Sequence, residues 1–315
     1  MPRANPLPSE LSTRPFTVRE ALDAGVGPDR LRRGDLVAPF HGGRAPAAVR
    51  LGLDGRCRLA LALAPPSAFV CGATAASVHG IPLPPRLAFR QDVELAVPAP
   101  GRAIRRAGVI GRVLRIEAPD LERVRRMSVT TPIRTWCDLG VLLHVPELVA
   151  AGDWLLRRGL ATASELERAA DRRLDRRGVV GIRTALPLLD GRAESPKESE
   201  LRAILHLAGL PAPDVNVDVV DPHGRFVARV DLLFAAYREV LEYQGDHHRT
   251  DRAQWRRDRT REAELESLGY HVTEVTDDDL ADPVAMVARL ARRLGGAGWT
   301  GSPRSLDGIR RRRRR

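Results

Sequence analysis

The C-terminal third of the chain shows the clearest alternation of hydrophobic and polar positions. Residues 215–220 and 226–234 are mainly apolar, and the turn Asp221–Gly224 between them is typical of a β-hairpin. A helix is expected before this hairpin, over 195–208. Further elements are expected in the order strand, helix, strand and amphipathic helix, at 239–244, 251–268, 270–275 and 277–294.

The N-terminal region predicts smaller elements. Short helices at 17–24 and 28–33, followed by a β-wing at 36–43, indicate a reduced winged helix. Two interpretations stay open: the second helix docks on DNA phosphates, or the region is a structural remnant that binds nothing. The arginines concerned are Arg30, Arg32 and Arg33.

Length and composition indicate a folded protein of about two domains. The chain has 315 residues, of which 43% are apolar, and this excludes global disorder. The formal charge of +11 includes six arginines at 310–315, so the rest of the chain is only mildly basic. Such a charge fits a nucleic-acid partner without requiring one.

The cysteines and the hydropathy bear on metal binding, disulfides and the cellular location of the protein. Cys57, Cys71 and Cys137 lie far apart, which predicts neither a disulfide framework nor a zinc site. The sequence contains no apolar run of membrane length and no signal-peptide segment. We therefore expect a cytoplasmic protein with no membrane partner and no small-molecule ligand.

Two carboxylates interrupt the apolar strands of the C-terminal third. Asp231 lies in the second expected strand and Glu242 in the third, where an unpaired acid would cost free energy. Strand alternation places Gln244 on the same face as Glu242, and His247 and His248 follow directly. Two acids on adjacent strands beside an amide and imidazoles suit a hard divalent cation and a bound water.

These residues resemble a known nuclease core. Asp231, followed by Glu242-Tyr243-Gln244, is similar to the Asp…Glu-x-Lys motif of the PD-(D/E)xK nucleases, with glutamine in place of lysine. The segment EYQGDHHRTDRAQWRRDRTREAELESLGYHV resembles the endonuclease domains related to very-short-patch-repair endonucleases. The chain also resembles actinobacterial proteins in which such a domain follows an abortive-infection-antitoxin-like winged-helix region.

The resemblance implies an α/β (α+β) fold with a restriction-endonuclease-like core around a mixed central sheet. The regions expected are 1–50, degenerate winged-helix-like; 51–190, mixed α/β and then helical; 193–295, endonuclease-like; and 296–315, a disordered Arg-rich tail.

The resemblance also assigns roles to individual residues. Asp231 and Glu242 would hold Mg²⁺ or Mn²⁺ together with the backbone carbonyl of Tyr243. Gln244 can only donate or accept hydrogen bonds, so a histidine would replace the usual lysine, with His248 favoured over His247. Glu198 matches an active-site glutamate on the first helix of the relatives, although Ser195 and Glu198 also have the spacing of a capping box.

The helix after the third strand supplies the expected DNA contacts. Asp258 and Arg261 are three residues apart, which fits either an ordinary surface ion pair or an arginine oriented toward a phosphate. By resemblance, Arg261 contacts phosphate and Asp258 orients it, while Arg256 and Arg257 follow the DNA backbone.

Together these features predict a metal-dependent DNA endonuclease, with DNA repair or defence as its setting. The alternative is a catalytically inactive DNA-binding regulator of antitoxin type. A nuclease directed at RNA is a third possibility, because the sequence contains no base-reading or sugar-reading motif.

Overall fold

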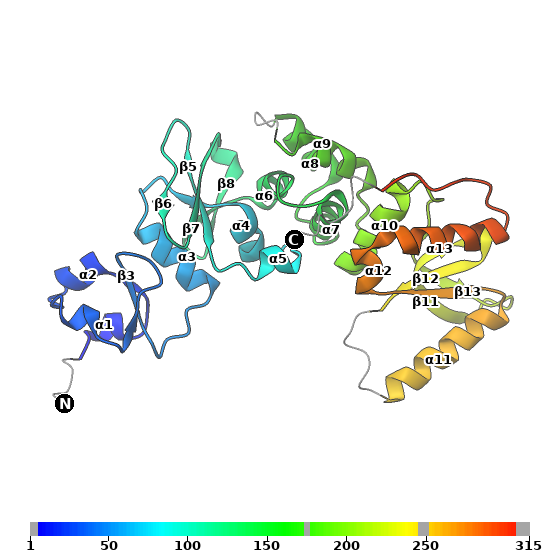
Figure 1. Cartoon of the computed structure of the whole chain (residues 1–315), viewed down its shortest axis with the longest axis horizontal. Coiled ribbons are helices and arrows are strands. Elements are labelled where there is room, and N and C mark those ends of the chain that lie inside the picture. Colours follow the sequence, from blue (N-terminus) through cyan, green and yellow to red (C-terminus); the bar gives the residue numbers. More distant parts are fainter. Residues whose placement is uncertain (1–5, 173–176, 245–251, 307–315) are drawn as a thin grey trace. The chain divides into compact units, whose positions relative to one another are not determined.

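Contacts divide the chain into two units, which are described separately. The computed structural model describes residues 6–172, 177–244 and 252–306, with the backbone alone for 252–258. The first unit comprises residues 1–142 and 171–177, and the second comprises 143–170 and 178–315 (Figure 1). The expected connecting region 51–190 is therefore shared between the units, because its helical part packs within the second.

The first unit contains two β-sheets with short helices. One sheet has the strand order β1-β3-β2 and the other β6-β7-β5-β4-β9-β8. Its largest apolar cluster includes Phe40, Leu59, Leu95 and Val129, all buried. The elements are α1 (Ser9–Ser12), β1 (Phe16–Thr17), α2 (Val18–Asp23), η1 (Arg30–Arg32), β2 (Leu36–Val37), β3 (Gly43–Pro46), α3 (Leu53–Ala62), β4 (Phe69–Val70), α4 (Gly72–His79), α5 (Pro85–Ala88), β5 (Val93–Pro98), β6 (Arg105–Arg106), β7 (Val109–Leu114), η2 (Ala118–Asp120), β8 (Leu121–Val124), β9 (Met127–Thr130) and α6 (Pro132–Leu139).

The N-terminal elements depart from the expected winged helix in one respect. The second helix, expected over 28–33, is only the short 3-10 helix η1, because a segment between Gly27 and Gly34 that buries only Leu31 has little apolar surface to fix a longer one. Arg30 forms two hydrogen bonds with Asp35, at 2.9 and 2.7 Å. The Arg30 guanidinium is thus held by Asp35, and both interpretations of the region stay open.

The second unit begins with helices that pack on its C-terminal part. Helix α7 (Val145–Arg157) contacts α10 (Pro196–Leu207) along much of its length. In the sequence, three further helices separate α7 from α10, namely α8 (Ala163–Arg172), α9 (Val179–Ala185) and η3 (Leu186–Leu188). A buried ion pair fixes this packing: Asp153 of α7 accepts a hydrogen bond of 2.7 Å from Arg202 of α10.

The rest of this unit is a four-stranded mixed sheet with helices on both faces. The strands β10 (Asp214–Val220), β11 (Phe226–Phe234), β12 (Glu239–Tyr243) and β13 (His271–Val275) lie in that order, and only β12 and β13 run parallel. Helix α11 (Arg252–Ser267) covers one face and α13 (Pro283–Gly296) the other (Figure 1). The expected α/β fold and the mixed sheet are confirmed.

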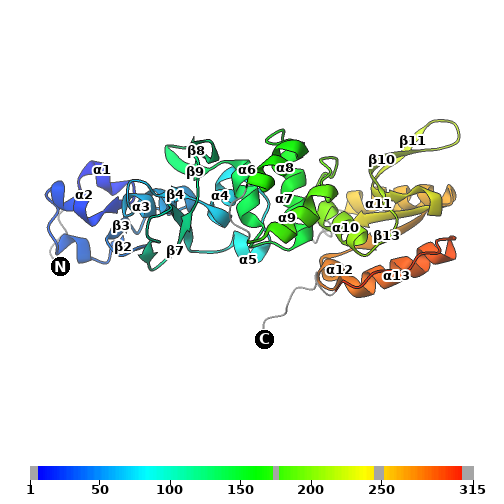
Figure 2. The same ribbon diagram turned by 90° about the horizontal axis from the view of Figure 1, so that it is seen from above.

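The apolar residues of the strands alternate between these two faces. Leu232 and Leu241 pack with Met286 and Leu290 of α13, whereas Leu233 and Val240 pack with Leu265 of α11. Pairing between β10 and β11 extends well beyond the short β11–β12 ladder, so these two strands continue as a projecting hairpin (Figure 2). A short helix η4 (Ala235–Tyr237) joins β11 to β12.

The last expected helix is interrupted. It forms α12 (Asp277–Ala281) and then α13, which are separated by Asp282 in a non-helical conformation (φ −129°, ψ 77°). The break has a local cause, since the residue before a proline is disfavoured in the helical region and Pro283 follows directly. Met286, Leu290 and Leu294 are buried, as the pattern predicted. Among the helices of the described residues, none combines the length and the hydropathy needed to cross a membrane.

Candidate active site

The two expected acids face each other where the β11–β12 ladder ends. The ladder pairs Leu232 with Leu241, so Asp231 and Glu242 occupy the next opposed positions, on the α11 face of the sheet. Just beyond the last pair of the ladder, Asp231 binds the neighbouring strand through its side chain. Its Oδ2 accepts a hydrogen bond of 2.9 Å from the Tyr243 N–H. The structure thus brings Asp231, Glu242 and Tyr243 together, as the sequence predicted.

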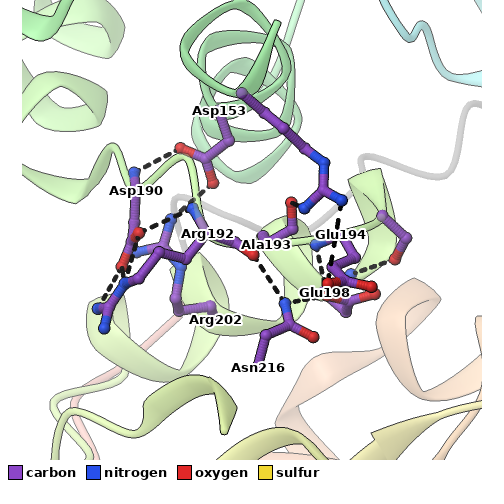
Figure 3. Close-up of polar contacts among 10 residues, drawn as sticks. Asp153, Asp190, Arg192, Ala193, Glu194, Glu198, Arg202 and Asn216 are labelled. Atoms are coloured by element: carbon purple, nitrogen blue, oxygen red, sulfur yellow. Dashed lines mark hydrogen bonds and ion pairs between the residues drawn. The ribbon is translucent and has the colours of Figure 1, made fainter. Parts of the chain in front are cut away.

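Glu198 reaches the same region from helix α10. Ser195 caps the helix by accepting a 3.2 Å hydrogen bond from the Glu198 N–H. The Glu198 carboxylate does not return to Ser195. Instead its Oε2 accepts from the Glu194 N–H at 2.8 Å and from the Asn216 side-chain amide at 2.9 Å (Figure 3). Only half of the expected capping box forms, and the carboxylate is left for the site.

Uncompensated negative charge marks this cluster. The pKa of Asp231 is raised from its ordinary value of 3.8 to about 6, and burial is the main cause. The charges of Glu198 and Glu194 raise this pKa as well. The Tyr243 N–H and the Arg261 guanidinium act in the opposite direction but do not offset the burial. A cation placed here would stabilise the ionised carboxylates.

Arg261 of α11 is the cation that the described structure places on the acid pair. Its guanidinium donates a hydrogen bond to Glu242 Oε2, and the two side chains are 36% and 12% exposed. Arg261 was expected to face a phosphate with Asp258 orienting it. It contacts Glu242 in the structure, the Asp258 side chain lies outside the described residues, and the phosphate contact stays a prediction.

Gln244 contacts a carboxylate that the sequence analysis did not single out. Its side-chain amide donates a 2.6 Å hydrogen bond to Glu274 of β13. Glu274 lies in register with Glu242 on the parallel strand beside it. A polar row therefore crosses the sheet, from Asp231 through Glu242 to Glu274, with Gln244 bound to the last of these acids.

The chemistry of these residues fits a hard divalent cation. Mg²⁺ binds through one or two carboxylates while keeping several waters, so Asp231, Glu242 and the Tyr243 carbonyl are suitable ligands. Burial is the main cause of the raised pKa of Asp231, with the charges of Glu198 and Glu194 adding to it, and a bound cation would offset both effects. In the parts of the chain that the structure describes, no group of three or more acidic, histidine or cysteine side chains forms a complete metal site.

Several expected site residues cannot be placed. His247 and His248 lie outside the described residues. Arg256 and Arg257 belong to the first part of α11, where the description covers the backbone alone. Their roles stay predictions.

Comparison with known proteins places the chain among mycobacterial relatives. It is 31% identical over 286 residues to the uncharacterized protein Rv2248 of Mycobacterium tuberculosis strain H37Rv, covering 90% of this chain and 99% of that protein. The identity and coverage are the same for the uncharacterized protein MT2308 of strain CDC 1551. The chain belongs to the same family as these two proteins. No protein-family model matches the chain, and no solved structure matches it.

Sequence reasoning missed two residues that the fold brings to the site of this family member. Glu274 lies in the strand HVTEV, which also contains His271 and Thr273, so it does not stand out as an acid within an apolar run in the way that Asp231 does. Asn216 is the polar residue between Val215 and Val217, and its left-handed backbone (φ 50°) was not visible in the strand pattern. Both residues reach the site through contacts with residues distant in the sequence, Asn216 with Glu198 and Glu274 with Glu242.

Proposed function

We propose that the second unit is a metal-dependent nuclease that hydrolyses phosphodiester bonds in DNA. The observation that carries the proposal is the acid pair Asp231–Glu242 at the end of the β11–β12 ladder, with Glu198 held beside it by α10. This arrangement agrees with the one implied by the resemblance to very-short-patch-repair-like endonucleases. A DNA substrate would place the activity in the cytoplasm, with repair or defence as its setting.

Each residue has a role that its position supports. Asp231 and Glu242 would hold Mg²⁺ or Mn²⁺, which when bound neutralises phosphate charge and lowers the pKa of a bound water. Arg261 contacts Glu242 and lies close enough to lower the pKa of Asp231, and its guanidinium would bind an oxygen of a phosphate held at these acids. Glu198 is buried beside Asp231 and would accept a hydrogen bond from the attacking water.

Gln244 is the residue that separates this proposal from its rival. Its amide is bound to Glu274 and carries no charge, so it does not perform the charge stabilisation of the usual lysine. An inactive DNA-binding regulator of antitoxin type would tolerate this substitution. The two functions differ in one measurable property, namely cleavage.

The deciding experiment is cleavage of supercoiled plasmid by the purified protein with Mg²⁺, Mn²⁺ or EDTA. Asp231→Asn should abolish metal-dependent cleavage while DNA affinity, measured by fluorescence anisotropy, is retained. Asp92→Asn is the matched control, because Asp92 is an exposed acid that belongs to the first unit. DNA binding without cleavage under every metal condition would support the regulator, and equal cleavage by Asp231→Asn would refute the site.

A further inference from the structure

Asn216 has a backbone conformation that is unusual for its place in a strand. It lies inside β10 with φ 50°, in the left-handed region that costs most residues about 1 kcal/mol. Asparagine is one of the few residues that tolerate this region. The pairs Val215–Leu232 and Val217–Val230 flank it, which sets Asn216 opposite Asp231. The unusual backbone thus occurs beside the acid cluster.

The side chain of Asn216 uses its amide nitrogen twice. The Nδ2 atom lies 2.9 Å from the Arg192 carbonyl oxygen and 2.9 Å from Glu198 Oε2 (Figure 3). A primary amide carries two N–H donors, so both contacts can be satisfied at once. Asn216 therefore joins the carboxylate of Glu198 to the chain segment that precedes α10.

We propose that Asn216 is a positioning residue that holds the Glu198 carboxylate in the nuclease site. The inference rests on the proposed function for its catalytic consequence, while the contact itself is independent of it. Glu198 is 6% exposed and lies near the charge of Asp231, which repels it. Hydrogen bonds to a buried carboxylate stabilise its charged form, and only Asn216 and the Glu194 N–H are described as donors to it.

The hydrogen bond from Asn216 to the Arg192 carbonyl is not the only contact that holds the segment before α10. Asp153 of α7 accepts a 2.6 Å hydrogen bond from the Asp190 N–H, and Arg157 donates to the Ala193 carbonyl at 3.3 Å (Figure 3). These anchors on α7 remain when the Asn216 amide is removed. Loss of the amide should therefore act mainly on Glu198.

The test compares Asn216→Gly with Asn216→Asp. Glycine adopts a positive φ without strain, so the first variant keeps the backbone and removes only the amide. We expect its kcat for plasmid cleavage to fall about tenfold to a hundredfold, with little change in KM. Asn216→Asp should lose at least as much, because a second carboxylate repels Glu198. A purely conformational role would leave both variants active.

A double-mutant comparison shows whether the effect passes through Glu198. Adding Asn216→Gly to Glu198→Gln should not slow cleavage further than Glu198→Gln alone, since the residue that Asn216 positions has already lost its function. Additive losses in the double variant would overturn the inference.

A readout without catalysis keeps the inference separate from the proposed function. The chain has two asparagines, Asn5 and Asn216, so its NMR spectrum contains few side-chain amide signals. Glu198→Gln should shift the Asn216 side-chain signals and leave those of Asn5 in place, because a neutral acceptor binds the amide less strongly. Glu274→Gln is the matched control, which should shift the Gln244 signals instead.

The outcomes are distinguishable. Unmoved Asn216 signals, or full activity of Asn216→Gly, would overturn the positioning role. If Glu198→Gln shifts the Asn216 signals but the wild-type protein cleaves no DNA, the contact is established and the nuclease proposal is refuted.

Discussion

Asp231 is ionised at neutral pH in a place that disfavours its charge. Burial and two neighbouring glutamates raise its pKa to about 6 from an ordinary value of 3.8. A raised acid pKa means that the folded state binds the proton more tightly than the unfolded state. Its contribution to stability is thus fully present below about pH 4 and is lost as the pH rises through about 6. At neutral pH, the buried charge of Asp231 therefore lowers the free energy of unfolding.

This linkage predicts that Asp231→Asn stabilises the protein at neutral pH. The amide oxygen can still accept from the Tyr243 N–H, and the buried charge is removed. We expect a gain of roughly 2 kcal/mol in the free energy of unfolding at pH 7.5 that disappears near pH 4. Urea unfolding at both pH values measures it, with Asp92→Asn as an exposed control in the first unit that changes little. Destabilisation at both pH values would contradict the account.

Arg261 compensates part of the same charge, and this yields a second prediction. Arg261→Gln leaves Glu242 without its described cation, so the metal-free protein should lose about 1 kcal/mol of stability. Mg²⁺ should restore more stability to this variant than it adds to the wild type, because it supplies the missing positive charge. Thermal unfolding with Mg²⁺ and with EDTA measures both effects.

Arg259→Gln is the matched control for that experiment. Arg259 lies on the same helix and pairs with Glu262, away from the acid pair. Equal Mg²⁺ effects in Arg261→Gln and the wild type would show that the cation does not bind at Glu242.

At the scale of elements, helix α10 separates a structural role from a chemical one. Ser195→Ala removes the cap of the helix and should cost about 1 kcal/mol of stability. Cleavage by the folded protein should persist, because the Glu198 carboxylate is held by Glu194 and Asn216 instead. Glu198→Gln should show the reverse, with stability largely kept and cleavage slowed to a low but measurable rate. Measuring both properties in both variants tests this, and parallel losses would refute the separation.

Local sequence signals predicted most elements of the second unit. The strand expected over 226–234 has those bounds in the structure, and the strand expected from 215 begins one residue earlier, at Asp214. Here the alternation of apolar residues and the turn at 221–224 act over a few neighbours. The helix expected from 277 is broken at Asp282, which the preference of residues before proline explains.

The site could be predicted only in part, because its geometry depends on distant pairing. Asp231 and Glu242 were recognisable as acids within apolar strands. The hydrogen bond from Asn216 to Glu198 joins residues 18 positions apart on a strand and a helix, and the register of Glu274 with Glu242 spans two strands. No local pattern encodes such contacts, and Arg261 likewise meets Glu242 only once α11 packs on the sheet.

At the scale of the whole molecule, the second unit extends further back along the chain than the motifs of its sheet. The motifs resemble a domain over 193–295, but helix α7 packs on α10 and belongs to the same unit from residue 143. Asp153 of α7 is 2% exposed and pairs with Arg202, which is itself buried. Replacing Asp153 while α7 stays in place would leave Arg202 as an uncompensated buried charge, which typically costs about 3 to 5 kcal/mol.

We therefore predict that a fragment starting at residue 143 folds cooperatively, whereas one starting at residue 193 does not. The shorter fragment loses the partner of Arg202 and exposes the apolar face of α10 that α7 covers. Circular dichroism during urea unfolding measures the cooperativity of each fragment. Asp153→Asn in the longer fragment isolates the ion pair, because it keeps α7 and removes only the charge. If the shorter fragment unfolds at the same urea concentration as the longer one, α7 is not part of the folding unit, and the positioning of Glu198 needs no support from it.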